Sequence, residues 1–179
     1  MKKILFLIAA MMLLGYAGAQ QVNWHTIEDA AEAKIGSRLY FFDFYTNWCG
    51  WCKKMDRETF SDPTVAKILN KYYYPVKFDA ESRREVIWNK RIYPAATEGT
   101  NNIHMFVRAS VGRRAGFPSY AMYRADGNRA QRLSGFMTAK EFVMVLWYYA
   151  SGDNEKYSFE NYQQIFDKEI KPVMEKALK

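Results

Sequence analysis

The chain of 179 residues contains two cysteines, and both lie in the sequence Cys49-Gly50-Trp51-Cys52. A nearly continuous apolar and aromatic run, Leu39 to Tyr45, precedes them, which is typical of a strand buried on both faces, and a helical pattern follows. At such a junction the two sulfurs lie one helical turn apart. The first lies at the helix N-terminus, where unpaired N–H groups and the helix dipole favour a thiolate. The spacing therefore predicts that Cys49 attacks a disulfide and that Cys52 resolves the mixed disulfide.

The residues beside the two sulfurs are suited to binding a peptide. Gly50 has no side chain, so a substrate backbone can approach the sulfur closely. Trp48 and Trp51 are expected to frame the sulfur with flat apolar surfaces that suit an extended chain. We therefore predict that these three residues bind substrate.

A structural disulfide and half of a zinc site are two other uses of a cysteine pair. A bridge from Cys49 to Cys52 closes so short a loop that it constrains the unfolded chain little. A zinc site requires two more ligands, and the two histidines, His25 and His104, are not at metal-ligand spacing. His104 is expected to be a packed or capping residue. The chain is thus expected to need no metal and no cofactor beyond the redox-active disulfide.

Asp43 and Pro118 are two further candidates. Asp43 lies within the apolar run before the dithiol, where a buried carboxyl group is expected to have a raised pKa and could accept a proton from Cys52. Phe117 precedes Pro118 at the start of a predicted strand, and cis peptide bonds are concentrated at X-Pro.

Together these motifs resemble those of the thioredoxin superfamily. The resemblance rests on the run from Asp43 to Lys53, with aspartate six residues before the first cysteine, and it is closest to exported members with Trp-Cys-Gly-Trp-Cys. It implies a nucleophilic Cys49, a resolving Cys52 and a proton-accepting Asp43. It also implies a cis Pro118 whose preceding backbone, at Phe117, pairs with substrate.

The chain departs from the family pattern in two places. The residues between the cysteines are not the glycine-proline of thioredoxin, so a strongly reducing potential is not implied. Family members often place a lysine near the buried aspartate, four residues before the aspartate that ends the next strand. In this chain that position is Pro75, so the partner lysine is expected to be absent and Lys77 to be out of register.

The expected fold is an α/β thioredoxin-like fold with a central mixed sheet flanked by helices. We assign residues 20–152 to this domain and 153–179 to a C-terminal helical extension kinked near Pro172. Residues 80–112 or thereabouts are expected to hold an insertion before the cis-proline. We expect residues 80–102 to form an irregular segment outside the core. We expect residues 103–113 to form a helix.

Residues 1–19 are typical of a cleavable signal peptide. They have a basic start, an apolar stretch from Ile4 to Leu14 and the small residues Ala17-Gly18-Ala19. The alternative is an uncleaved membrane anchor, which the short apolar stretch disfavours. The chain is therefore expected in the periplasm or secreted. Its net charge of +7 includes no sustained basic tract, so nucleic acid is not an expected partner.

The leading hypothesis is a periplasmic thiol–disulfide oxidoreductase that reduces protein or peptide disulfides with electrons from a membrane thiol donor. An oxidase or isomerase of the same chemistry is one alternative. A non-catalytic thioredoxin-fold binding module, with the insertion and the tail holding a partner, is another. The sequence leaves the oligomeric state open.

Overall fold

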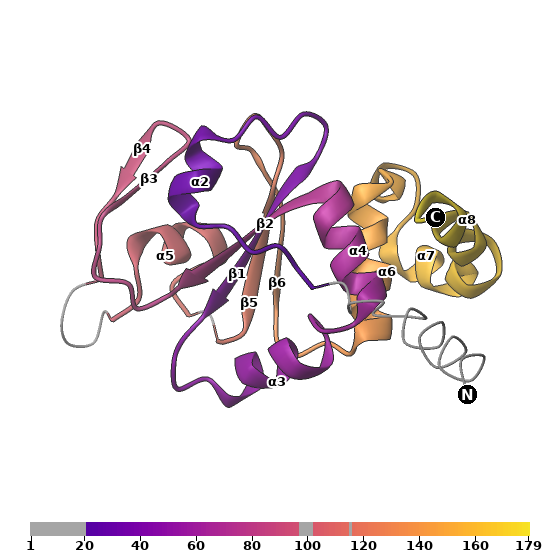
Figure 1. The fold of residues 1–179 in the computed structure, drawn as a ribbon, viewed down its shortest axis with the longest axis horizontal. Helices are drawn as coiled ribbons and strands as arrows, with labels where there is room; N and C mark the ends of the chain where they lie inside the picture. Colours follow the sequence, from indigo (N-terminus) through magenta and orange to yellow (C-terminus); the bar gives the residue numbers. More distant parts are fainter. Residues whose placement is uncertain (1–20, 97–101, 115) are drawn as a thin grey trace, which may run out of the picture.

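A four-stranded mixed sheet forms the centre of the protein in a computed structural model that describes residues 21–96, 102–114 and 116–179 (Figure 1). The strands, in the order in which they lie side by side, are β2 (Tyr73–Asp79), β1 (Leu39–Tyr45), β5 (Ser119–Tyr123) and β6 (Arg129–Ser134). β1 runs parallel to β2 and antiparallel to β5, which pairs antiparallel with β6. β1 is thus an interior strand, as its apolar sequence predicts. The signal-peptide prediction concerns residues outside the described ranges.

Helices cover both faces of this sheet (Figure 1). One face packs against α3 (Gly50–Glu58), α4 (Pro63–Tyr72) and α6 (Ala139–Ala150), and the other against α2 (Ile27–Glu32) and α5 (Met105–Val111). Because side chains alternate along a strand, Phe41 belongs to the first hydrophobic cluster and Phe42 and Phe44 to the second. Asp43 shares the face of Phe41, and it therefore faces the side that α3 covers.

Local signals in the sequence explain where several of these elements begin. Asp62 accepts hydrogen bonds from the backbone N–H groups of Thr64 and Val65 and so caps α4. Thr138 and Glu141 form a capping box at the start of α6. The Asp126-Gly127 turn joins β5 to β6, with Gly127 at a positive φ of 81°. These predicted boundaries are confirmed.

The prediction that residues 80–102 stay outside the core is wrong for the first half of this segment. Strands β3 (Val86–Trp88) and β4 (Arg91–Tyr93) form an antiparallel hairpin, and Val86 and Trp88 are buried in the cluster that also contains Phe106 of α5. The hairpin packs against α2. Alternating burial over only three residues, in a stretch rich in polar side chains, was too weak a periodic signal to predict a strand.

Trp88 is a test of this packing. Its ring lies 4.6 Å from that of Tyr40 and 4.9 Å from that of Phe42, measured between ring centroids, and the residue is 4% exposed. We expect Trp88→Ala to lower the free energy of unfolding by about 3–5 kcal/mol, because it removes a large buried ring and leaves a cavity. Urea unfolding measures this loss.

Ile87 on the same hairpin supplies the matched control, since it is 58% exposed. Ile87→Ala should change the stability by no more than about 0.5 kcal/mol. Equal effects of the two substitutions would contradict a role for the hairpin in the core.

The C-terminal extension is helical and packs on the main domain. It contains a short 3-10 turn η1 (Asp153–Glu155), α7 (Phe159–Ile165), a π-helical turn η2 (Phe166–Ile170) and α8 (Lys171–Ala177). Its buried apolar and aromatic residues join the cluster of α4 and α6, and they are Tyr162, Phe166, Met174 and Leu178. The predicted kink near Pro172 corresponds to the π-helical turn, and Pro172 occupies the first turn of α8. Within the described ranges no helix has the length and apolar character needed to cross a membrane.

Candidate active site

A disulfide between Cys49 and Cys52 lies where β1 leads into α3. The two Cα atoms are 5.3 Å apart. Cys49 is the N-cap residue of α3, and its sulfur accepts a hydrogen bond from the backbone N–H of Cys52 at 3.0 Å. The first turn of α3 contains no acidic residue. A reduced Cys49 would therefore lie beside the unpaired N–H groups of the first helical turn, at the positive end of the helix dipole. Both features stabilise a thiolate.

Two exposed tryptophans stand beside the disulfide. Trp48 is 67% and Trp51 57% exposed, whereas Cys49 is only 4% exposed. The ring of Trp48 meets that of Phe117 at a centroid distance of 6.3 Å, and the ring of Trp51 meets that of Phe136 at 5.6 Å. Each of the two tryptophans that flank the cysteines in sequence therefore contacts a second aromatic ring and leaves much of its own surface exposed.

The segment that follows β2 holds Trp48 in place. The indole Nε1–H of Trp48 donates a hydrogen bond of 3.1 Å to the carboxylate of Glu81. The same carboxylate accepts a bond from the side-chain amide of Asn102, to which Arg83 donates in turn. Sequence reasoning missed Glu81, because nothing in its local pattern signals a contact with a residue 33 positions earlier.

The Phe117–Pro118 peptide is cis, as the resemblance to the thioredoxin superfamily implies. Pro118 is buried at the entrance to β5, and its carbonyl accepts the backbone N–H of Gly135 at the end of β6. Among the described residues, no hydrogen bond uses the backbone N–H or C=O of Phe117. These two groups are available to another chain.

Asp43 is buried in the middle of the sheet, at 2% exposure. Its cross-strand neighbours are Lys77 on β2 and Tyr120 on β5, which the register places directly opposite it. One carboxylate oxygen, Oδ1, has no hydrogen-bond partner among the described residues, and the Tyr120 hydroxyl has none either. Such groups are costly to bury in charged form.

The expectation that Asp43 lacks a lysine partner is wrong. Lys77 Nζ lies 3.6 Å from Asp43 Oδ2, and it also forms an ion pair with Asp56 on α3. The prediction failed because it counted back from Asp79 with a family spacing. In this parallel pair Asp79 lies opposite Tyr45, so the residue two positions earlier is the one that faces Asp43.

The charges around Asp43 oppose one another. Burial raises the pKa of the Asp43 carboxyl group from 3.8 to about 7, the positive charge of Lys77 lowers it, and the negative charge of Asp56 raises it. Asp56 follows Cys52 by four residues on α3, so the two share a helix face. This spacing could have revealed Asp56 in the sequence, and we did not predict it.

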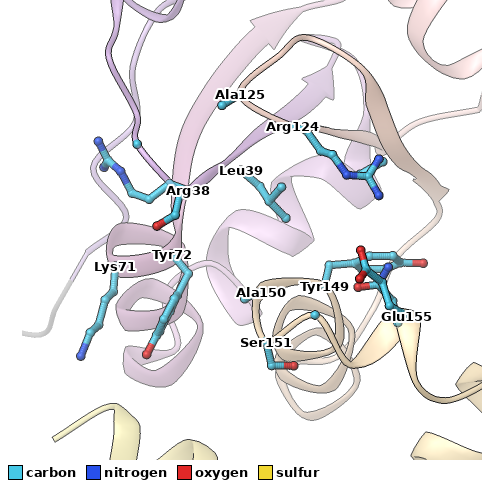
Figure 2. A pocket seen from close by; sticks show the side chains of 15 residues that line it. Arg38, Leu39, Lys71, Tyr72, Arg124, Ala125, Tyr149, Ala150, Ser151 and Glu155 are labelled. Atoms are coloured by element: carbon cyan, nitrogen blue, oxygen red, sulfur yellow. The ribbon is translucent and has the colours of Figure 1, made fainter.

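Other polar features lie away from the disulfide. His104 is buried and caps α5 through its side chain, which confirms the capping prediction. A cavity of about 630 Å³ opens beside the start of β1, at the opposite end of that strand from Cys49. Figure 2 shows Arg38 and Lys71 on one side of this cavity and Arg124 near Tyr149 on the other. Among the described residues no three His, Cys, Asp or Glu side chains are grouped closely enough to hold a metal ion.

Comparison with known proteins agrees with this geometry. Residues 27–150 match the thioredoxin-like domain family. The chain is 29% identical over 118 residues to the thiol:disulfide interchange protein DsbD of Vibrio vulnificus, an alignment that covers 65% of this chain and 17% of that protein. Two similar solved structures are a thioredoxin from Thermus thermophilus and a putative disulphide-isomerase from Bacteroides thetaiotaomicron.

The two structures support the fold. The thioredoxin has a TM-score of 0.53 at 20% identity, with 77% of this chain and 98% of the other covered. The putative disulphide-isomerase has a TM-score of 0.52 at 23% identity, with 74% and 95% covered. Because the family match spans most of the chain and includes the cysteine pair, this protein belongs to the thioredoxin-like domain family.

Proposed function

We propose that the protein is a thiol–disulfide oxidoreductase that reduces disulfides in proteins or peptides through Cys49 and Cys52. The observation that carries this proposal is the placement of Cys49. Cys49 is the N-cap residue of α3, and its sulfur already accepts a hydrogen bond from a backbone N–H. Helix α3 covers the face of the sheet on which the buried Asp43 lies. The similarity to a thiol:disulfide interchange protein supports the same chemistry.

The reaction has two exchange steps. The Cys49 thiolate attacks one sulfur of the substrate disulfide, forms a mixed disulfide with it and expels the other sulfur as a thiolate. Cys52 then loses its proton and attacks the Cys49 sulfur, which releases the second substrate thiolate and re-forms the Cys49–Cys52 disulfide. Two electrons pass from the dithiol to the substrate.

We propose that Asp43 accepts the proton that Cys52 loses in the second step. A carboxyl group with a pKa near 7 is partly ionised at neutral pH and can take up a proton there, whereas an ordinary aspartate is almost fully ionised and a poor acceptor. The side chains of Lys77 and Asp56 are more exposed than that of Asp43, and both are positioning residues whose charges shift the pKa of Asp43. Trp48, Gly50 and Trp51 line the approach to the sulfur, and Phe117 and Pro118 supply a backbone edge for the substrate.

We further propose that the protein works in the periplasm. The pattern of residues 1–19 supports export by a signal peptide. Because that compartment is oxidising, a reductase there needs a supply of electrons, and we assign this role to a membrane thiol donor.

Reduction of insulin tests the proposed activity. Pre-reduced wild-type protein, recycled by dithiothreitol, should accelerate the precipitation of insulin B chain, and Cys49→Ser should show only the rate of dithiothreitol alone. The reason is that serine is not a nucleophile toward disulfides at neutral pH. Activity of Cys49→Ser equal to that of the wild type would contradict the proposal.

A further inference from the structure

A second hollow lies beside the predicted substrate edge, on the face of the sheet that α5 covers. It has a volume of about 590 Å³ and lies between the end of α5, the start of β5 and the end of β6. Gly116 and Ser119, which flank Phe117 and Pro118 in sequence, both line it. Ser119 pairs with Phe44 near the end of β1, so this hollow is at the same end of the sheet as the disulfide.

Two arginines, Arg114 and Arg132, line this groove, and no carboxylate does. Within the described part of the chain, neither guanidinium forms an ion pair or a hydrogen bond. The neighbouring Arg129 differs, because it donates to the carbonyls of Ala109 and Ser110 at the end of α5. The groove therefore holds two exposed positive charges that no carboxylate of the described chain neutralises.

We propose that this groove binds an acidic side chain of the substrate, an aspartate or glutamate close to the disulfide that Cys49 attacks. A guanidinium offers a planar pair of donors that matches a carboxylate, and Arg114 and Arg132 provide two of them. The inference rests on the proposed function and names the substrate class of that same site.

The position of the groove fits a peptide bound at Phe117. Because the N–H and C=O of Phe117 are free of partners among the described residues, an extended substrate can add to this edge as a strand does. Residues of such a strand follow at about 3.3 Å each, so a side chain next to the attacked cysteine is within reach of a groove that begins at Gly116.

Two other charged side chains near the disulfide already have partners within the protein. Glu81 lies on the side of Trp48 and Phe117, and its two carboxylate oxygens accept hydrogen bonds from the indole N–H and from Asn102, neutral donors that leave its negative charge in place. Lys54 lies over the rings of Trp51 and Phe136 and forms an ion pair with Glu58 at 3.7 Å. Arg114 and Arg132, unlike Lys54, have no acidic partner among the described residues, so the groove is where a basic substrate segment would meet repulsion.

Three disulfide-linked model peptides test the proposal. They are identical except that the residue next to the cysteine is glutamate, glutamine or lysine, in one series before the cysteine and in a second series after it. The value of kcat/KM for each peptide is divided by that for the glutamine peptide with the same protein variant, so that a general loss of activity cancels. In at least one series we expect the glutamate peptide to be favoured over the lysine peptide by about tenfold at low salt, and less at high salt.

Substitution of the arginines assigns this preference to the groove. The double variant Arg114→Gln with Arg132→Gln should bring the glutamate-to-lysine ratio close to one. Arg124→Gln is the matched control, because Arg124 is exposed and follows the far end of β5, and it should keep the wild-type ratio. No preference in the wild type, or a preference that survives the double substitution, would overturn the proposal.

A binding measurement separates this inference from the proposed function. Cysteine-free versions of the three peptides are titrated into the oxidised protein and followed by tryptophan fluorescence, which needs no turnover. If no peptide is reduced, the proposed function is contradicted. The proposal that the groove binds an acidic side chain is then tested by the binding measurement alone. Tighter binding of the glutamate peptide that the double substitution removes would still support the groove, and equal binding of all three peptides would overturn it.

Discussion

Cys52→Ser is expected to stop turnover and to accumulate as a mixed disulfide with its substrate. Cys49 precedes α3 and accepts the N–H bond that stabilises a thiolate, so the first attack does not need the second cysteine. Without Cys52 nothing resolves the adduct, and insulin reduction should fall by on the order of 10³-fold or more. Non-reducing electrophoresis and mass spectrometry of the intact adduct measure both effects.

Cys49→Ser is the matched control for the trap, because it retains one thiol at the other end of the same turn. It should form no more than traces of adduct, since Cys52 lies inside the helix and lacks the N-cap position. Equal trapping by both variants would contradict the assignment of Cys49 as the attacking thiol.

Asp43→Asn is expected to stabilise the oxidised protein at neutral and alkaline pH. Burial raises the pKa of Asp43 to about 7 in the folded protein, against 3.8 for the free side chain. Between these two values the unfolded chain has released a proton that the folded chain keeps, so the free energy of unfolding falls as the pH rises through this window. A difference of about three pKa units corresponds to roughly 4 kcal/mol.

The gain in stability should therefore be about 2–4 kcal/mol near pH 8 and close to zero near pH 4, because a buried asparagine amide retains part of the cost of burial. Urea unfolding of both proteins across this pH range measures it. A gain that does not depend on pH would show that Asp43 titrates at its ordinary pKa and would contradict the account.

The same substitution should slow the second exchange step. With Asp43→Asn no side chain accepts the proton of Cys52, so release of the substrate should be on the order of 10²-fold slower and should lose its dependence on pH near 7. Neighbouring variants provide a matched pair. Asp56→Asn removes a negative charge and should shift this pH dependence downward, whereas Lys77→Met removes a positive charge and should shift it upward. Shifts in the same direction would contradict the proposed roles of these two residues.

Strong local signals allowed much of the fold to be predicted from the sequence. The long apolar run of β1, the caps at Asp62 and Thr138 and the Asp126-Gly127 turn all specify structure within a few residues, and they are confirmed. The buried position of Asp43 followed from its apolar neighbours. The β3–β4 hairpin was missed because its two inward residues, Val86 and Trp88, stand among polar side chains.

The site was harder to predict wherever it depends on the register between strands. Lys77 faces Asp43 because β2 pairs with β1 in a register that the sequence of either strand alone does not specify. Glu81 reaches Trp48 through the path of the chain after β2, which no periodic pattern encodes. The cysteine spacing, by contrast, determines its own geometry within one helical turn, and for that reason it was the most informative feature of the sequence.

The reduction potential of the Cys49–Cys52 pair tests the central claim most directly. The protein is equilibrated with thiol–disulfide buffers of known potential and alkylated, and the oxidised fraction is read from the intact mass. A redox-active pair should titrate as a two-electron couple between about −270 and −120 mV, and toward the lower end of that range if the protein works as a reductase. A pair that stays oxidised until below about −300 mV would behave as a structural disulfide and would contradict the account.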